Sequence, residues 1–65
     1  MFNIGDYVLN QKTGYIGQVI GYGQQVIDNV CATTLKVLVA QAENSSQRGF
    51  VVEDLLCVWI QWPNA

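Results

Sequence analysis

The chain has 65 residues, of which 51% are hydrophobic and 12% are charged, and its formal net charge at pH 7 is −2. Globular domains average about 25% charged residues, so this chain has more apolar side chains than a small core can bury, and we expect a partner or a second copy to cover the remainder. The basic residues, Lys12, Lys36 and Arg48, are too few for strong phosphate-backbone binding unless an oligomer clusters them.

The first half of the chain alternates short β-rich runs with glycine turns. Residues 7–9 and 15–22 are predicted strands, separated by the turn-forming Lys12-Thr13-Gly14. Residues 24–32 have two interpretations. They extend the second strand into a long hairpin that turns near Asp28-Asn29, which is the interpretation we favour, or they form a loop.

The second half begins with the clearest strand, residues 33–42. Its alternation places Leu35, Val37 and Val39 on one face and Lys36, Leu38 and Ala40 on the other. Residues 50–52 are a further short strand. Residues 53–56 are expected to form a single 3₁₀ turn, with Leu55 plugging the end of the core, before a closing strand at 58–62.

The two ends of the chain resemble those of SH3-like small barrels. Gly5-Asp6-Tyr7-Val8, followed by Gly14, Gly17 and Val19, is similar to the opening of KOW, Tudor-like and CarD-like domains. The segment from Phe50 to Val58 is similar to their end, with a strand, a short turn with a buried leucine and a closing strand. The resemblance implies a single all-β domain over residues 1–65, folded as a five-stranded SH3-like barrel with a short 3₁₀ turn before the last strand.

Catalytic and metal-binding constellations are not recognisable in the sequence. Histidine, the commonest general base, is absent, and Cys31 and Cys57 are too few for a zinc site. We interpret both cysteines as free thiols in or near the core; the alternative is a disulfide between them, which their spacing does not decide. Adjacent Glu53 and Asp54 are interpreted as turn-capping residues. We therefore expect no enzyme activity, no cofactor and no metal. With no targeting or membrane-spanning segment recognisable, a cytoplasmic location is the default expectation.

The aromatic residues support two alternatives. Either the rings fill and seal a small core, or some of them form a cage for a methylated cation, as the Tudor-like resemblance implies. Trp59 is the ring expected to be exposed, because Val58 and Ile60 occupy the opposite face of its strand.

Two classes of function follow from these features. The first is a protein-interaction or regulatory module that binds itself or another protein through an apolar sheet face. The candidate interaction residues are Tyr22, Leu38, Arg48, Trp59 and Trp62. The second, implied by the KOW and CarD resemblance, is a nucleic-acid or transcription-associated module that uses Lys12, Lys36 and Arg48.

Overall fold

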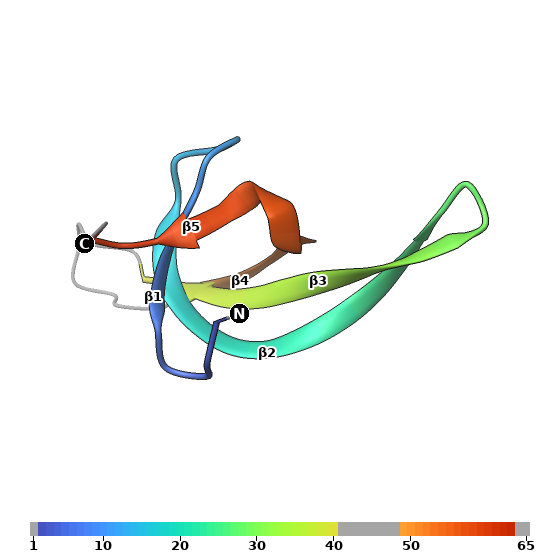
Figure 1. Cartoon of the computed structure of the whole chain (residues 1–65). Helices are drawn as coiled ribbons and strands as arrows, with labels where there is room; N and C mark the ends of the chain where they lie inside the picture. Colours follow the sequence, from blue (N-terminus) through green and yellow to red (C-terminus); the bar gives the residue numbers. More distant parts are fainter. Residues whose placement is uncertain (1, 41–48, 64–65) are drawn as a thin grey trace.

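A computed structural model describes residues 2–40 and 49–63, which form an all-β structure (Figure 1). The elements in chain order are β1 (Tyr7–Asn10), β2 (Ile16–Ile27), β3 (Val30–Val39), β4 (Phe50–Leu55), the 3₁₀ turn η1 (Leu56–Val58) and β5 (Trp59–Gln61). All strand pairs are antiparallel. The predicted all-β class, the number of strands and the presence of one 3₁₀ turn are confirmed.

The five strands form one sheet in the order β4-β3-β2-β1-β5. This architecture is compatible with an SH3-like fold, but the sheet is not closed into a barrel, because β4 and β5 remain at its two edges. The edge strand β5 is short and pairs with β1 over three residues. The turn η1 lies between the two edge strands in sequence, and its Leu56 and Val58 pack against the core.

The core is small and lies on the inner face of the curved sheet. Its buried hydrophobic residues are Val8, Val19, Leu35, Val37, Val39 and Trp59. The predicted grouping of Leu35, Val37 and Val39 on one face of β3 is confirmed, and the structure shows that this face is the buried one. Alternation places residues i and i+2 of a strand on one face, so the intervening Lys36 and Leu38 face outwards.

Residues 24–32, for which the sequence allowed a hairpin or a loop, form the hairpin. β2 and β3 pair continuously to Ile27 and Val30, and the turn is made by Asp28 and Asn29. Both turn residues have positive φ, 52° and 65°, as a two-residue type I′ turn requires. Aspartate and asparagine tolerate this left-handed conformation better than most residues, which explains why the chain reverses here.

Two local expectations are wrong. The 3₁₀ turn comprises residues 56–58 rather than 53–56, because Glu53 and Asp54 continue β4 and pair with Lys36 and Leu35. The partly buried Leu55 ends β4, and the neighbouring Leu56 is the leucine packed against the core. The expected position of the cysteines in or near the core is also wrong, because Cys31 and Cys57 are free thiols but exposed.

Candidate functional site

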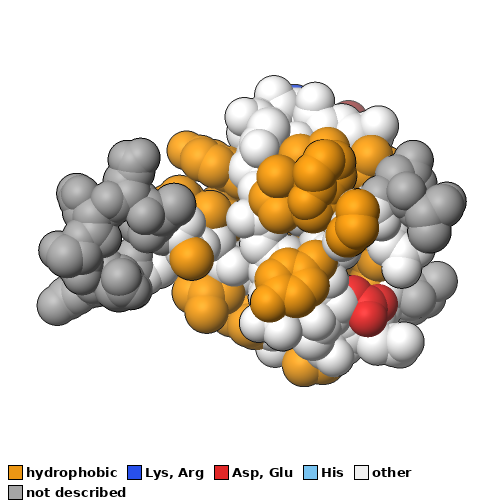
Figure 2. Space-filling view, turned by 90° about the vertical axis from the view of Figure 1, so that its left-hand side faces the viewer, with side chains coloured by type: hydrophobic (Ala, Val, Ile, Leu, Met, Phe, Trp, Pro, Cys, Tyr) orange, Lys and Arg blue, Asp and Glu red, His pale blue; other side chains and the backbone are white. Residues whose placement is uncertain are grey.

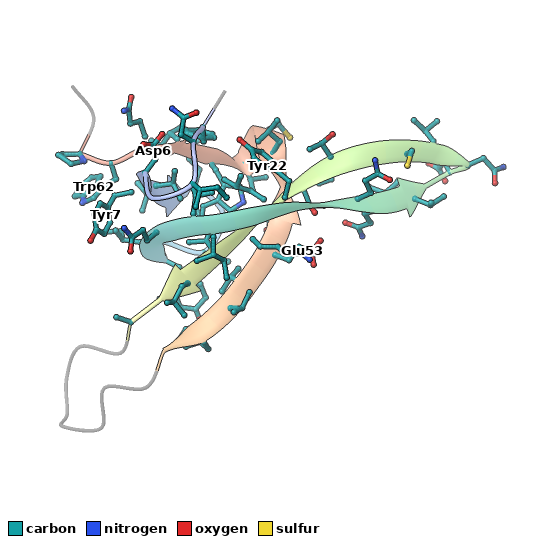
Figure 3. The ribbon with its side chains drawn as sticks, turned by 90° about the horizontal axis from the view of Figure 1, so that it is seen from below. Asp6, Tyr7, Tyr22, Glu53 and Trp62 are labelled. Atoms are coloured by element: carbon teal, nitrogen blue, oxygen red, sulfur yellow. The ribbon has the colours of Figure 1, made fainter. Side chains whose placement is uncertain are left out.

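A mainly apolar row of side chains crosses the sheet on the side opposite the core, with one polar residue, Gln18, in its middle. The strand register places Tyr7 beside Gln18, Gln18 beside Leu38, and Leu38 beside Val51. Trp62 extends the row past β5, because its backbone N–H donates to the Tyr7 carbonyl at 2.9 Å (Figure 3). Residues directly opposite each other in a sheet project to the same side, so these five side chains share one face. We call this row and the neighbouring Ile16 the outer face.

The outer face is unusually exposed for its composition. The exposed fractions are 54% for Tyr7, 41% for Leu38, 54% for Val51 and 41% for Trp62. Figure 2 shows hydrophobic side chains gathered on the face that lies to the left in Figure 1, with one small group of acidic atoms beside them. Single exposed apolar residues are common on protein surfaces, but a contiguous group of them usually marks an interaction site.

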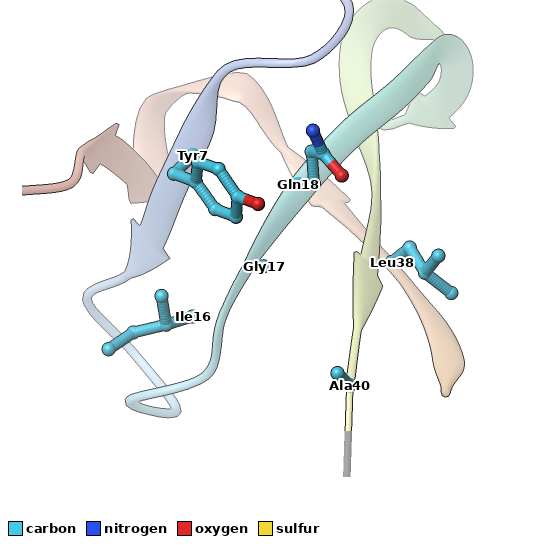
Figure 4. Close-up of a pocket in the computed structure, with 6 residues that line it drawn as sticks. All are labelled: Tyr7, Ile16, Gly17, Gln18, Leu38 and Ala40. Carbon is cyan, nitrogen blue, oxygen red and sulfur yellow. The ribbon is translucent and has the colours of Figure 1, made fainter. Parts of the chain in front are cut away.

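A hollow of about 190 Å³ lies within the outer face. It is lined by Tyr7 from β1, by Ile16, Gly17 and Gln18 from β2, and by Leu38 and Ala40 at the end of β3 (Figure 4). A cavity of about 150 Å³ with an apolar lining is enough to hold a benzene ring. The hollow therefore has room for one aromatic or branched aliphatic side chain. Gln18 contributes a polar group to the lining, although its amide nitrogen already donates to the Gly5 carbonyl at 3.1 Å.

Charged side chains lie around the outer face rather than within it. Lys36 and Glu53 pair across β3 and β4, one row beyond Leu38 and Val51. Lys12 lies in the turn that follows β1, with its Nζ 3.4 Å from Asp54 Oδ2. Within residues 2–40 and 49–63 the two lysines thus each lie beside a carboxylate, and they form no cationic patch.

The candidate interaction residues are only partly brought together. Leu38 and Trp62 share the outer face. Tyr22 lies elsewhere: it pairs with the buried Leu35, and its hydroxyl donates to the Phe2 carbonyl. Arg48 lies outside the described residues.

Trp59 is a correction, because the tryptophan expected to be exposed is only 3% exposed. Its register partner is Asn10, which lies on the same face of β1 as the core residue Val8. The indole Nε1 donates to the Asp54 carbonyl at 3.4 Å. Trp59 is therefore a core residue, and the exposed tryptophan is Trp62.

Tyr7, Ile16 and Val51 belong to the outer face but were not singled out from the sequence. Tyr7 carried a usable signal, because it precedes a valine that enters the core and alternation then turns its ring outwards. Ile16 and Val51 carried none, because assigning them to this face requires the register between strands.

The aromatic rings do not form a cage in the described part of the chain. One close ring pair occurs there, between Tyr15 and Phe50, with centroids 5.3 Å apart and an edge-to-face angle of 78°. This pair lies at one rim of the sheet, where Phe50 begins β4. A cage for a methylated cation needs several rings around one point, and two rings in edge contact do not provide that.

Asp54 anchors a polar cluster at the end of the core. Its Oδ1 accepts a hydrogen bond from the Leu55 backbone N–H at 2.9 Å, and its Oδ2 accepts one from Asn10 Nδ2 at 3.2 Å. The buried Asn10 in turn accepts hydrogen bonds from the backbone N–H groups of Lys12 and Thr13. The cluster therefore ties the turn after β1 to the end of β4, which is a structural role.

These contacts predict an acid dependence of stability. The Leu55 N–H bond, followed by those from Asn10 and Lys12, holds the pKa of Asp54 below its ordinary value of 3.8. A lowered pKa means that this stabilisation is present above pH 3.8 and is lost as the pH falls through the folded-state pKa. Urea titrations from pH 6 to pH 2 should show a smaller acid loss for Asp54→Asn than for the wild type. Asp28→Asn, at the hairpin tip, should retain the wild-type profile, and identical profiles for all three proteins would contradict this role.

Comparison of the chain with protein-family models, curated proteins and solved structures finds no match. Within the described ranges, no group of three or more potential metal-ligating side chains comes together. A search of the same residues for a helix of membrane-spanning length and apolarity finds none. Among the features of the described structure, the outer face is thus the strongest candidate for a functional site.

Proposed function

We propose that the chain is a small, non-catalytic, SH3-like module that binds an apolar segment of another protein through its outer face. One observation carries this proposal: the register aligns Tyr7, Leu38, Val51 and Trp62 across the sheet, and all of them are exposed. Burying such a row removes apolar surface from water at about 25 cal/mol per Å², a driving force that needs no charged groups.

The hollow gives the proposed contact its centre. Protein interfaces draw most of their binding energy from a few well-packed anchors surrounded by contacts that exclude water. An aromatic or aliphatic side chain of the partner would enter between Tyr7 and Leu38, while Trp62 and Val51 cover the flanks. The partner class is therefore a segment with an apolar anchor, and the charges of Lys36 and Glu53 would remain at the rim.

Selection from a displayed peptide library tests this function, followed by calorimetry with the selected peptides. We expect the wild type to select peptides with a central aromatic or aliphatic residue, and Leu38→Lys to weaken their binding about tenfold or more. Val30→Lys is the matched control, because it also replaces an exposed aliphatic residue of β3, but at the far end of the strand. Its affinity should stay within about twofold of the wild type.

Two results would overturn the proposal. One is equal binding of the selected peptides by the wild type and by Leu38→Lys. The other is an absence of selected peptides together with salt-sensitive binding of RNA or DNA, which would favour the nucleic-acid-binding alternative instead.

A further inference from the structure

A second exposed feature lies away from the outer face, in the two-stranded arm formed by residues 20–33. β1 pairs with β2 only as far as Gln18, and β4 pairs with β3 only from Thr34, so the arm has no neighbouring strand within the described residues. Figure 1 shows it projecting from the rest of the sheet. The radius of gyration is 12.3 Å, against about 11 Å for a compact chain of this length.

The β2 side of the arm presents hydrogen-bonding groups with no partner among residues 2–40 and 49–63. In a two-residue hairpin the flanking residues, Ile27 and Val30, bond to each other, and alternate residues then direct their N–H and C=O groups outwards. On β2 these are Val26, Gln24 and Tyr22. Val19 shows what such groups do when a partner is available: it bonds to Gly5 and Asp6. We call the outward side of residues 20–27 the arm edge.

The arm edge lacks the protection found at the other sheet edges. Exposed edges in natural proteins are usually short, charged or interrupted by proline, which prevents pairing with another strand. The edge strand β5 is three residues long and is soon followed by Pro63, and the edge strand β4 contains Glu53 and Asp54. The eight residues of the arm edge, IGYGQQVI, contain no charge and no proline.

We propose that the arm edge pairs with the arm edge of a second copy of this chain, as an antiparallel strand pair about a two-fold axis near Gly23 and Gln24. Antiparallel pairing of a strand with itself is compatible with two-fold symmetry, so one surface serves both copies. The pairing brings no like charges together: Asp28 is the one charged residue of the arm, and the two copies of it would lie at opposite ends of the pair. An equivalent two-fold pairing of β4 would instead bring the Glu53 and Asp54 carboxylates of both copies close together.

Pairing would also cover apolar side chains that the monomer leaves in water. Val26 is 69% exposed and Ile27 is 40% exposed, although both lie in a regular strand. A two-stranded ribbon is marginally stable in water, and a four-stranded sheet formed by two arms is more stable because each β2 then has a neighbour on both sides. The dimer therefore stabilises the element of the monomer that has the fewest neighbours.

Sedimentation equilibrium and native mass spectrometry test the proposal. We expect the wild type to have twice its monomer mass of 7.2 kDa at high micromolar concentration. Val26→Pro removes an outward N–H and should yield a monomer. Cys31→Pro is the matched control, because Cys31 is the cross-strand partner of Val26 and loses an outward N–H from the other strand of the arm. This variant should remain a dimer. Circular dichroism checks that both variants fold.

Hydrogen exchange on the wild type keeps the test decisive if either proline variant unfolds. Protection of the Tyr22, Gln24 and Val26 amides should increase with protein concentration, whereas those of Gly23 and Gln25, which already bond to β3, should change little. A wild-type monomer at high concentration would overturn the proposal, as would dissociation by Cys31→Pro but not by Val26→Pro. Peptide binding at the outer face is a separate property, and a folded Val26→Pro variant should retain it.

Discussion

Trp59→Ala is expected to remove about half of the protein's free energy of unfolding. Trp59 is 3% exposed and packs with the five other buried hydrophobic residues of the core. Truncation of a buried tryptophan costs about 3–5 kcal/mol. A domain of this length has a total free energy of unfolding of about 3–10 kcal/mol, so the loss is a large fraction of the whole. Urea unfolding followed by far-ultraviolet circular dichroism measures it, and a folded Trp59→Ala protein of near wild-type stability would contradict this assignment.

Trp62→Ala is the matched control, because it removes the other tryptophan of the chain from an exposed position. Its free energy of unfolding should stay within about 0.5 kcal/mol of the wild type. The variant also isolates the fluorescence of Trp59, which should be blue-shifted and resistant to acrylamide. If the outer face binds peptides as proposed, this stable variant should bind them more weakly. Red-shifted, readily quenched emission would show that Trp59 is exposed.

Local patterns in the sequence predicted the centre of the sheet well. The alternation correctly grouped Leu35, Val37 and Val39 on one face of β3, because side chains of a strand return to the same face every second residue. Asp28-Asn29 identified the hairpin turn for a similarly local reason, the tolerance of both residues for positive φ. Neither inference required knowledge of any distant contact.

The errors occurred where a face or a boundary depends on distant pairing. Trp59 was placed outside by counting alternation from Val58, but Val58 belongs to η1, where strand alternation does not apply. Its true face follows from pairing with Asn10, 49 positions earlier in the chain. Likewise, Glu53 and Asp54 suit the start of a helical turn, yet pairing with β3 keeps them in β4. Register with distant strands overrides local propensity in both cases.

The outer face was predictable in part from local sequence and depends in part on pairing between distant strands. Leu38 was predictable as an outward residue of β3, and Trp62 as a candidate for interaction. Their membership of one row with Tyr7 and Val51 was not, because it depends on three strand registers and on the 2.9 Å hydrogen bond from Trp62 to Tyr7. The sequence therefore predicted that apolar surface would be left over, and the structure shows where it gathers.

Gly17→Ala should be the most damaging small substitution on β2. Gly17 is buried where β2 passes close to β3, and an added Cβ would lie 2.9 Å from the Leu38 carbonyl carbon and 2.7 Å from Val37 Cγ1, with the Leu38 carbonyl oxygen closer still. Backbone atoms cannot move aside as a flexible side chain does, so β2 or β3 must shift. Overpacking of this kind costs about 1–3 kcal/mol and occasionally more, a large part of the stability of so small a domain.

Gly21→Ala separates this steric effect from the general consequences of replacing a strand glycine. Gly21 lies on the same strand, but the nearest atom to its added Cβ is Lys36 Cδ at 4.0 Å, an ordinary contact. Reduced freedom of the unfolded chain should then make Gly21→Ala neutral or stabilising by up to about 1 kcal/mol. Urea midpoints compare the two variants directly, and equal midpoints would show that β2 and β3 are not packed as closely as described. Because Gly17 also lines the hollow between Tyr7 and Leu38, a shift of β2 there should weaken peptide binding at the outer face as well.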